Sequence, residues 1–166
     1  MEKFPLKKVI DKFFDEYRFL SNFYPAQVSL DDGKWQYKSV EHAYVAAKTT
    51  SEIMRFEVSG IPTAGEAKKF GKTLVIRPDW NKVRLGIMEN LVRQKFSDPE
   101  LREKLFATDP HELVEGNNWH DNFWGSCVCT NCGNKGENNL GKILMQIREE
   151  IRQPSLFPID LKASIV

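Results

Sequence analysis

The sequence predicts a mainly α-helical domain of the α+β class, with a small β-hairpin near the N-terminus. Apolar residues recur at helical spacing in several segments, most clearly from about residue 138 onward. Residue types typical of helix starts precede these segments. Alternation of apolar and polar residues, which is typical of strands, is confined to residues 28–37.

The N-terminal part contains the expected hairpin and the helix that follows it. Residues 28–30 and 35–37 alternate in polarity, and the Asp32-Gly33 pair between them is a favoured two-residue turn. Ser39 is an expected N-cap, because its hydroxyl can accept a hydrogen bond from the first helical turn. The helix that it begins is expected to run to about Thr49.

The sequence in the middle of the chain predicts two further helices. Thr63 and Glu66 have the spacing of a capping box, in front of a short basic helix. Asp79 is expected to cap a longer helix from Trp80 to about Phe96, whose apolar residues fall on one face.

The C-terminal part adds two helices and a long irregular segment. Asp98 followed by Pro99 has the order of a helix start, and the last helix is expected to begin near Asn138. Between these helices, residues 111–136 hold an aromatic cluster and all the cysteines. An irregular segment of this length inside a compact domain is usually functional.

Length and charge restrict the classes of function. A chain of 166 residues is expected to form one domain, here residues 1–153, followed by a tail at residues 154–166. A net charge of +1 disfavours a protein that mainly grips duplex nucleic acid or an anionic membrane. No segment has the pattern of a signal peptide or a membrane span, so the expected compartment is the cytoplasm.

The three cysteines lie together in a C-x-C-x2-C pattern, as Cys127, Cys129 and Cys132. They could supply three zinc ligands, with His120 as a fourth. Structural zinc sites usually draw paired ligands from two separate segments, and only one cluster is present here. An odd number of cysteines without a secretory signal favours free, reduced thiols, so the sequence predicts no metal and no cofactor.

The segment Trp119-His120-Asp121-Asn122-Phe123-Trp124-Gly125 is the most informative candidate for a site. The indoles of Trp119 and Trp124 offer flat faces on which a nucleobase or sugar can stack. Asp121 between them can stabilise positive charge on a stacked ligand. The competing interpretation is that Asp121 serves only as a turn or cap residue.

A second acid, Glu41, is expected at the second position of its helix, where the helix dipole favours negative charge. The dipole alone is a sufficient reason for an acid there. However, Glu41, Tyr44 and Lys48 recur at helical spacing and would share one face. Trp80 begins its helix and is either a core residue or part of the same site.

Two acids, stacking rings and no obvious metal fit the hydrolysis of a glycosidic bond. A carboxylate can stabilise the oxocarbenium-like transition state, and a second acid can activate water or protonate the leaving group. For an N-glycoside the leaving group is a heterocyclic base, which an indole can hold. A set of basic residues could bind phosphate, although most are expected on solvated helix faces: Lys48, Lys68, Lys69, Lys72, Arg77 and Arg84.

Several motifs, in order and spanning residues 13–152, resemble the YbiA-like family, also called NADAR. The blocks are Ser21-Asn22-Phe23, Ser39-Val40-Glu41-His42-Ala43-Tyr44-Val45-Ala46-Ala47-Lys48, Arg77-Pro78-Asp79-Trp80, Leu113-Val114-Glu115, Asp121-Asn122-Phe123-Trp124-Gly125 and Asn139-Leu140-Gly141-Lys142-Ile143-Leu144-Met145. The resemblance implies a mainly helical single domain with N-glycosidase activity. Family substrates include ribosylaminopyrimidine 5′-phosphates of the early riboflavin pathway, and other members are implicated in NAD and ADP-ribose metabolism.

The resemblance implies catalytic roles for Glu41 and Asp121 and a substrate-binding role for Trp80. It also implies that the Ser21-Asn22-Phe23 segment lines the site. Tyr44, Lys48, Trp119 and Trp124 complete the expected substrate-binding set. Many members have an Asp directly after the Trp-Gly pair, where this chain has Ser126, so Asp121 would act without that acid.

Other functions remain open at this point. One is an ADP-ribosyl-guanine hydrolase that reverses nucleic-acid ADP-ribosylation, and another is a non-catalytic module that binds ADP-ribose or NAD. A third is a zinc-stabilised interaction domain. The expected partner is a small ribosyl phosphate or ADP-ribose, with ADP-ribosylated nucleic acid as a further candidate and no membrane, while the sequence leaves the oligomeric state undefined.

Overall fold

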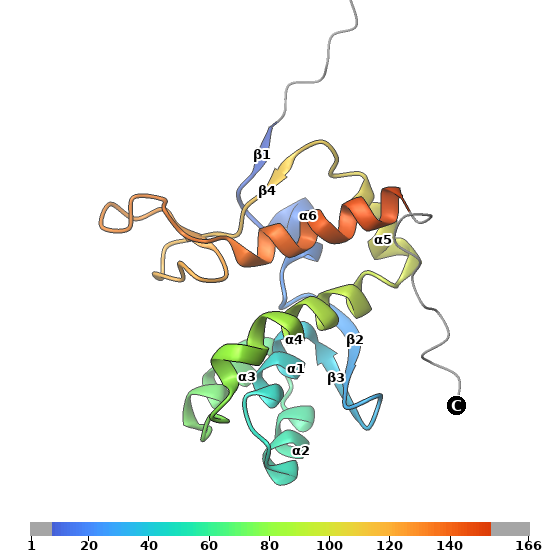
Figure 1. Ribbon diagram of the computed structural model, residues 1–166, viewed down its shortest axis with the longest axis vertical. Helices are drawn as coiled ribbons and strands as arrows, with labels where there is room; N and C mark the ends of the chain where they lie inside the picture. The colour runs from blue at the N-terminus through green and yellow to red at the C-terminus, as the bar shows by residue number, and fades with distance from the viewer. Residues whose placement is uncertain (1–7, 154–166) are drawn as a thin grey trace, which may run out of the picture. The chain divides into compact units, whose positions relative to one another are not determined.

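The computed structural model describes residues 8–153, so the expected tail lies outside the described residues. The chain divides into two compact units (Figure 1). The first, which we call the α1 unit, is Phe13–Leu101. The second, the α6 unit, is Met1–Lys12 with Arg102–Val166.

The α1 unit holds the hairpin and most of the helices. Its elements are η1 (Asp15–Leu20), β2 (Pro25–Leu30), β3 (Trp35–Ser39), α1 (Val40–Ala47), α2 (Glu52–Gly60), α3 (Ala64–Phe70), η2 (Gly71–Thr73) and α4 (Trp80–Lys95). Helix α5 (Pro99–Phe106) begins in this unit and ends in the other.

Helix α1 is the centre of the α1 unit. All eight of its residues are buried, and it packs against α2, α3, α4 and both strands of the hairpin. Ser39 caps it as predicted, because its hydroxyl accepts a hydrogen bond from the amide of His42 at 3.3 Å. A helix this short is marginal alone, so the packing around it holds it in place.

The hairpin turns at the predicted Asp32-Gly33 pair, but its connection is longer than the two residues expected. Strand β2 ends at Leu30 and β3 begins at Trp35, so residues 31–34 join them. The amide of Lys34 donates to the carbonyl of Asp31 at 3.1 Å, and φ is positive at Asp31, Asp32 and Gly33, with values of 52°, 52° and 91°. Aspartate and glycine are residue types that adopt this left-handed conformation.

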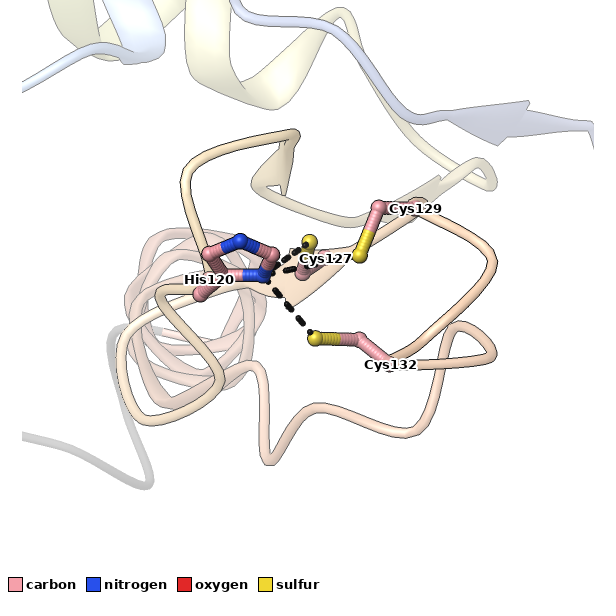
Figure 2. A group of neighbouring side chains, drawn as sticks. All are labelled: His120, Cys127, Cys129 and Cys132. Carbon is pink, nitrogen blue, oxygen red and sulfur yellow. Dashed lines mark hydrogen bonds between the residues drawn. The ribbon is translucent and has the colours of Figure 1, made fainter.

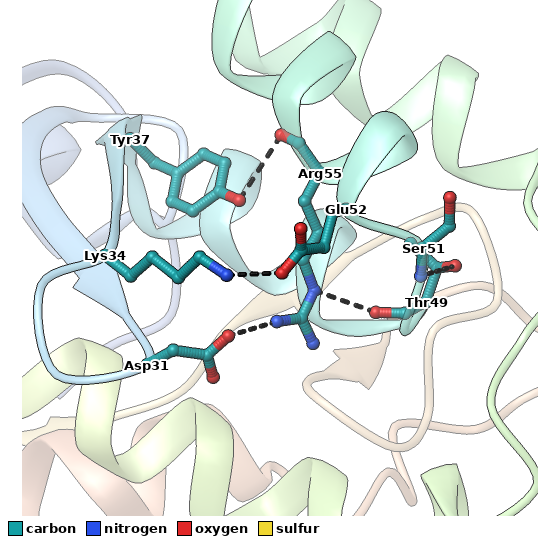
Figure 3. Close-up of polar contacts among 7 residues, drawn as sticks. All are labelled: Asp31, Lys34, Tyr37, Thr49, Ser51, Glu52 and Arg55. Carbon is teal, nitrogen blue, oxygen red and sulfur yellow. Dashed lines mark hydrogen bonds and ion pairs between the residues drawn. The ribbon is translucent and has the colours of Figure 1, made fainter.

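Polar contacts tie this hairpin to α2 (Figure 3). The Arg55 side chain pairs with Asp31 and donates to the carbonyl of Thr49 at 2.9 Å. Tyr37 donates from its hydroxyl to the carbonyl of Arg55 at 3.3 Å, and burial raises its pKa to about 12. One arginine therefore links the turn, the end of α1 and α2.

The predicted helix caps are confirmed with one exception. Thr63 and Glu66 form a reciprocal capping box, and the Asp98 carboxylate accepts from the amide of Leu101 at 3.0 Å. Asp79 occupies the N-cap position of α4 as expected, but its side chain makes no capping hydrogen bond. Its carboxylate is held by the guanidinium of Arg77 through two bonds of 2.6 and 2.8 Å, a pairing stronger than one amide can offer.

The α6 unit consists of short parallel strand pairs and one long helix. Strand β1 (Val9–Ile10) pairs with β4 (Glu112–Leu113), and β5 (Gly116–Asn117) pairs with β6 (Ser126–Cys127). Helix α6 (Asn139–Arg152) buries the predicted stripe, including Leu140, Ile143, Leu144 and Ile147. Residues 111–136, expected to be irregular, thus contain three short strands.

The predicted fold class is confirmed, because helices dominate and the strands are few and short among the described residues. None of the described helices combines the length and the apolar character needed to cross a membrane.

Candidate functional site

Glu41 lies in the first turn of α1 with 9% of its surface exposed. Its amide donates to the carbonyl of Asn22 at 3.0 Å. This bond joins the start of α1 to the Ser21-Asn22-Phe23 segment, so two motifs nearly twenty positions apart meet at one point. Glu41 is therefore a buried acid beside an irregular loop.

Two aromatic rings lie near Glu41: Tyr44 shares its helix face, and Trp80 packs against Tyr44. The ring centroids of Tyr44 and Trp80 are 5.0 Å apart with an interplanar angle of 52°. Both side chains are buried, and Trp80 is the first residue of α4. Tilted contacts of this kind stabilise the packing of α1 on α4, so Trp80 is a core residue that also borders the candidate site.

Lys48 places positive charge at this site. Its ammonium lies 5.4 Å from the centre of the Tyr44 ring. Burial lowers the pKa of Lys48, while the nearby charge of Glu41 raises it and that of Lys68 lowers it. The predicted acid, ring and ammonium of α1 therefore interact as a group.

Lys68, one of the predicted phosphate-binding candidates, is exposed as expected and also lies near this group. Its ammonium lies 5.6 Å from the ring centre of Phe23, and it acts electrostatically on Lys48. Phe23 is 40% exposed, so the cation and an accessible ring face occur together. The capping box that fixes the start of α3 is the local signal that places Lys68, but its neighbour Phe23 comes only from the tertiary fold.

Lys95 is a residue that sequence reasoning missed. It is 2% exposed, and its ammonium donates to the carbonyl of Ser21 at 2.7 Å. Burial lowers its pKa to about 7. A charged side chain near the end of a helix is normally solvated, so no sequence pattern distinguishes this lysine. It holds the loop that contacts Glu41.

The seven predicted residues of the α1 unit thus form one connected group, which we call the α1 site: Ser21, Asn22, Phe23, Glu41, Tyr44, Lys48 and Trp80. A separate hollow of about 470 Å³ in this unit is lined by residues such as Tyr24, Gln94 and Leu101, and no predicted site residue lines it.

Asp121, in the α6 unit, organises its own loop. Its Oδ1 accepts hydrogen bonds from the amides of Phe123 at 3.2 Å and Trp124 at 2.9 Å. Its backbone exchanges two bonds with the Asn117 side chain, at 3.1 and 2.7 Å. These contacts are those of the competing turn interpretation, and they leave the chemical role of Asp121 as a prediction.

The aromatic residues around Asp121 differ in exposure. Trp119 is 50% exposed, while the rings of Phe123 and Trp124 meet edge to face with centroids 4.8 Å apart. Since Asp121 and Glu41 belong to different units, their predicted convergence on one sugar also remains a prediction.

Ser126, at the position where family members often have Asp, is a buried structural residue. Its hydroxyl donates to Asn134 Oδ1 at 2.8 Å and accepts from the amide of Gly136 at 3.1 Å. In this chain the position therefore closes the loop that contains the cysteines.

Comparison with known proteins agrees with these observations. The family model for the NADAR domain matches residues 10–152, nearly all of the described chain. The chain belongs to the NADAR family. This confirms the family resemblance seen in the sequence motifs.

Three NADAR relatives illustrate the family. The N-glycosidase Npun_R5314 of Nostoc punctiforme is 37% identical over 149 residues, which cover 85% of this chain and 90% of that protein. The riboflavin biosynthesis protein VVA0006 of Vibrio vulnificus is 32% identical, over 84% of this chain and 37% of the relative.

The third relative is YbiA of Escherichia coli, which is named an N-glycosidase. Its NMR structure matches with a TM-score of 0.74 and 29% identity, over 95% of this chain and 93% of YbiA. These names agree with the enzyme class predicted from the sequence, a glycosidase that hydrolyses N-glycosyl compounds.

Proposed function

We propose that this NADAR protein is an N-glycosidase that hydrolyses the bond between ribose and base in ribosylated, phosphorylated bases. Candidate substrates are ribosylaminopyrimidine 5′-phosphates of the early riboflavin pathway. The names of two relatives as N-glycosidases and of a third as a riboflavin biosynthesis protein support this class. The observation that carries the proposal is the buried carboxylate of Glu41 within a group of rings and ammonium ions.

Glu41 is the residue that acts on the sugar. Cleavage of the N-glycosidic bond leaves positive charge on the anomeric carbon and the ring oxygen. A carboxylate in a partly desolvated position interacts strongly with such charge, and its place in the first helical turn favours the anionic form. Glu41 stabilises this charge or orients the water that attacks it.

Lys48 and the rings of the α1 site, together with the neighbouring Lys68, bind the rest of the substrate. Lys48 and Lys68 are close enough to influence each other, so a phosphate between them would relieve their repulsion. Phe23 offers the most accessible ring in the α1 site for stacking, because Tyr44 and Trp80 are buried. This assigns the phosphate to the lysines and the base or ribose to Phe23.

The test compares Glu41→Gln with a matched control, Glu57→Gln, at an exposed position of α2. Removal of one group that stabilises transition-state charge typically lowers kcat by about 10²–10³-fold. We expect that loss for Glu41→Gln, with unchanged circular dichroism, and the parent rate for Glu57→Gln. Turnover at the parent rate by Glu41→Gln would overturn the assignment.

The substrate panel separates the two N-glycosidase candidates. Mass spectrometry measures release of ribose 5-phosphate from ribosylaminopyrimidine 5′-phosphates and release of ADP-ribose from ADP-ribosylated guanine in DNA. Preferential release from the first supports the proposal, and preferential release from the second assigns the protein to ADP-ribosyl hydrolysis. Ligand binding without turnover of either would make it a binding module and refute catalysis.

A further inference from the structure

Four potential metal ligands converge in the α6 unit (Figure 2). The sulfur atoms of Cys127, Cys129 and Cys132 and a ring nitrogen of His120 all lie within 4.8 Å of one another. Nδ1 of His120 is 3.8, 3.5 and 3.4 Å from the three sulfurs, in that order. The four side chains point toward a common centre: His120 precedes β6, Cys127 ends it, and the other two cysteines follow it.

Hydrogen bonding does not account for this arrangement. One imidazole nitrogen carries either one proton or one lone pair, so it makes one good hydrogen bond in the ring plane. Three sulfurs at similar distances from Nδ1 exceed what that nitrogen can satisfy. A cation at the centre would interact with all four atoms at once.

The distances fit a single tetrahedral ion. With a Zn–S bond of about 2.3 Å and a Zn–N bond of about 2.05 Å, the tetrahedral N–S edge is about 3.6 Å. The three measured values, 3.4 to 3.8 Å, lie on both sides of it. These N–S edges match one central ion, and three soft sulfurs with one imidazole are a donor set typical of zinc.

The conformation of the backbone around the four ligands brings their side chains together. Cys127 ends β6, and its amide donates to Asn122 Oδ1 at 3.0 Å. After it, the amides of Cys132 and Gly133 both donate to the carbonyl of Cys129, at 3.2 and 3.0 Å, which forms a tight turn with Gly133 at φ 61°. Glycine is favoured at such a φ, so the turn that carries the last two thiols is locally encoded.

His120 reaches the thiols from the opposite side. Its φ of 66° is uncommon for a residue with a side chain. The buried Asn117 side chain binds the backbone of the next residue, Asp121, twice, and so holds the loop in this conformation. Because Asn117 also pairs with Cys127 between β5 and β6, the histidine and the first cysteine are set by one strand pair.

We propose that His120, Cys127, Cys129 and Cys132 bind one Zn²⁺ as a closed structural site. Four protein ligands leave no open position, so this zinc holds the loop and takes no part in the reaction. The sequence named His120 as a possible fourth ligand, and the pairing of β5 with β6 is what brings its loop to the cysteines. The site is new relative to the N-glycosidase proposal and does not depend on it.

Zinc binds cysteine as the thiolate, so binding releases thiol protons to solvent and the affinity depends on pH.

The test uses the full chain expressed in zinc-supplemented medium and dialysed against metal-free buffer. We expect about one zinc per chain by elemental analysis, and replacement by Co²⁺ should give the visible bands of a tetrahedral cobalt thiolate. Cys129→Ser and Cys132→Ser should lose at least about tenfold in zinc affinity, by competition with a chelating dye. The matched control Thr130→Ala, exposed in the same turn, should bind like the parent.

A further variant tests the histidine itself. His120→Asn removes the imidazole but keeps a residue that tolerates positive φ, so the backbone is preserved. It should weaken zinc at least about tenfold and alter the cobalt spectrum. Unchanged affinity would refute His120 as a ligand. Less than about 0.1 zinc per chain with three reactive thiols, or a disulfide between two of them in freshly purified protein, would overturn the site as a whole.

Discussion

Glu41 lies on a helix that is buried along its whole length, whereas Asp121 lies in a loop between two-residue strands. Helix α1 is held by apolar packing against three helices and a hairpin. The loop of Asp121 is held by hydrogen bonds from polar side chains to the backbone, and by the proposed zinc. Apolar packing holds α1 without a bound ligand, while a loop fixed by ligands and amides is only as rigid as those contacts.

This difference predicts that the two units depend on different variables. In the α1 unit, the buried amine of Lys95 supports the site loop through the Ser21 carbonyl, so we expect that loop to be sensitive to protonation. In the α6 unit, the loop is sensitive to metal. The proposed activity would thus depend on Lys95 in one unit and on zinc in the other, and each can be removed separately.

Zinc removal is expected to have the largest effect, and only in the α6 unit. Structural zinc contributes on the order of 10 kcal/mol of apparent free energy in zinc-finger peptides, so its loss should free the loop even if α6 stays folded. Hydrogen exchange of amides in residues 117–136 should then accelerate by at least about 100-fold, with α1 unchanged. Mass-spectrometric exchange before and after chelation measures both. Equal acceleration in α1 would mean that the comparison between the units is wrong.

Local features of the fold could be predicted from the sequence. Ser39, the Thr63–Glu66 capping box and the Asp32-Gly33 turn were predictable because each acts within a few residues. The Asp79 carboxylate was expected to cap α4, but it binds the guanidinium of Arg77 through two hydrogen bonds instead.

The candidate sites were predictable only as sets of residues. Motif order identified Glu41 and its helix, but the contacts of Lys68 with Phe23 and of Lys95 with Ser21 join segments far apart in the chain. The cysteine spacing was visible, yet the approach of His120 depends on the β5–β6 pair and on Asn117. Tertiary contacts of this kind leave no local pattern.

The stability of the α1 unit is expected to depend on pH. In the folded protein Lys95 loses its proton near pH 7, whereas in the unfolded chain it does so near pH 10.5. Between these values the unfolded state binds more protons, so the free energy of unfolding should rise with pH by up to about 1.4 kcal/mol per unit. Lys95→Met should abolish this slope.

Urea unfolding of the parent and of Lys95→Met between pH 7 and 9.5 measures the slope. This window avoids Tyr37, whose raised pKa makes stability fall above about pH 10, when the phenol ionises in the unfolded chain first. Since zinc binding also varies with pH, both proteins are compared in saturating zinc. A parent-minus-variant difference that stays constant over the window would show that Lys95 keeps its proton when folded.

The smallest effect is expected at Asp121, and it separates structure from chemistry. Asp121→Ala removes the acceptor of two amides and should cost about 1–2 kcal/mol of stability, as measured for residues that cap helices in this way. Asp121→Asn keeps an oxygen at Oδ1, so its free energy of unfolding should lie within about 0.5 kcal/mol of the parent value. The two variants therefore differ in stability but share the loss of charge.

Activity of Asp121→Asn then decides the role of the carboxylate. If Asp121 is the second acid, kcat falls by about 10²-fold or more although the loop is intact, which thermal unfolding in zinc can verify. If it is only a turn residue, Asp121→Asn turns over like the parent and only Asp121→Ala is impaired, in proportion to its stability. The second outcome would leave Glu41 as the one acid of the reaction, and would make the zinc-bound loop a support for the aromatic residues beside it.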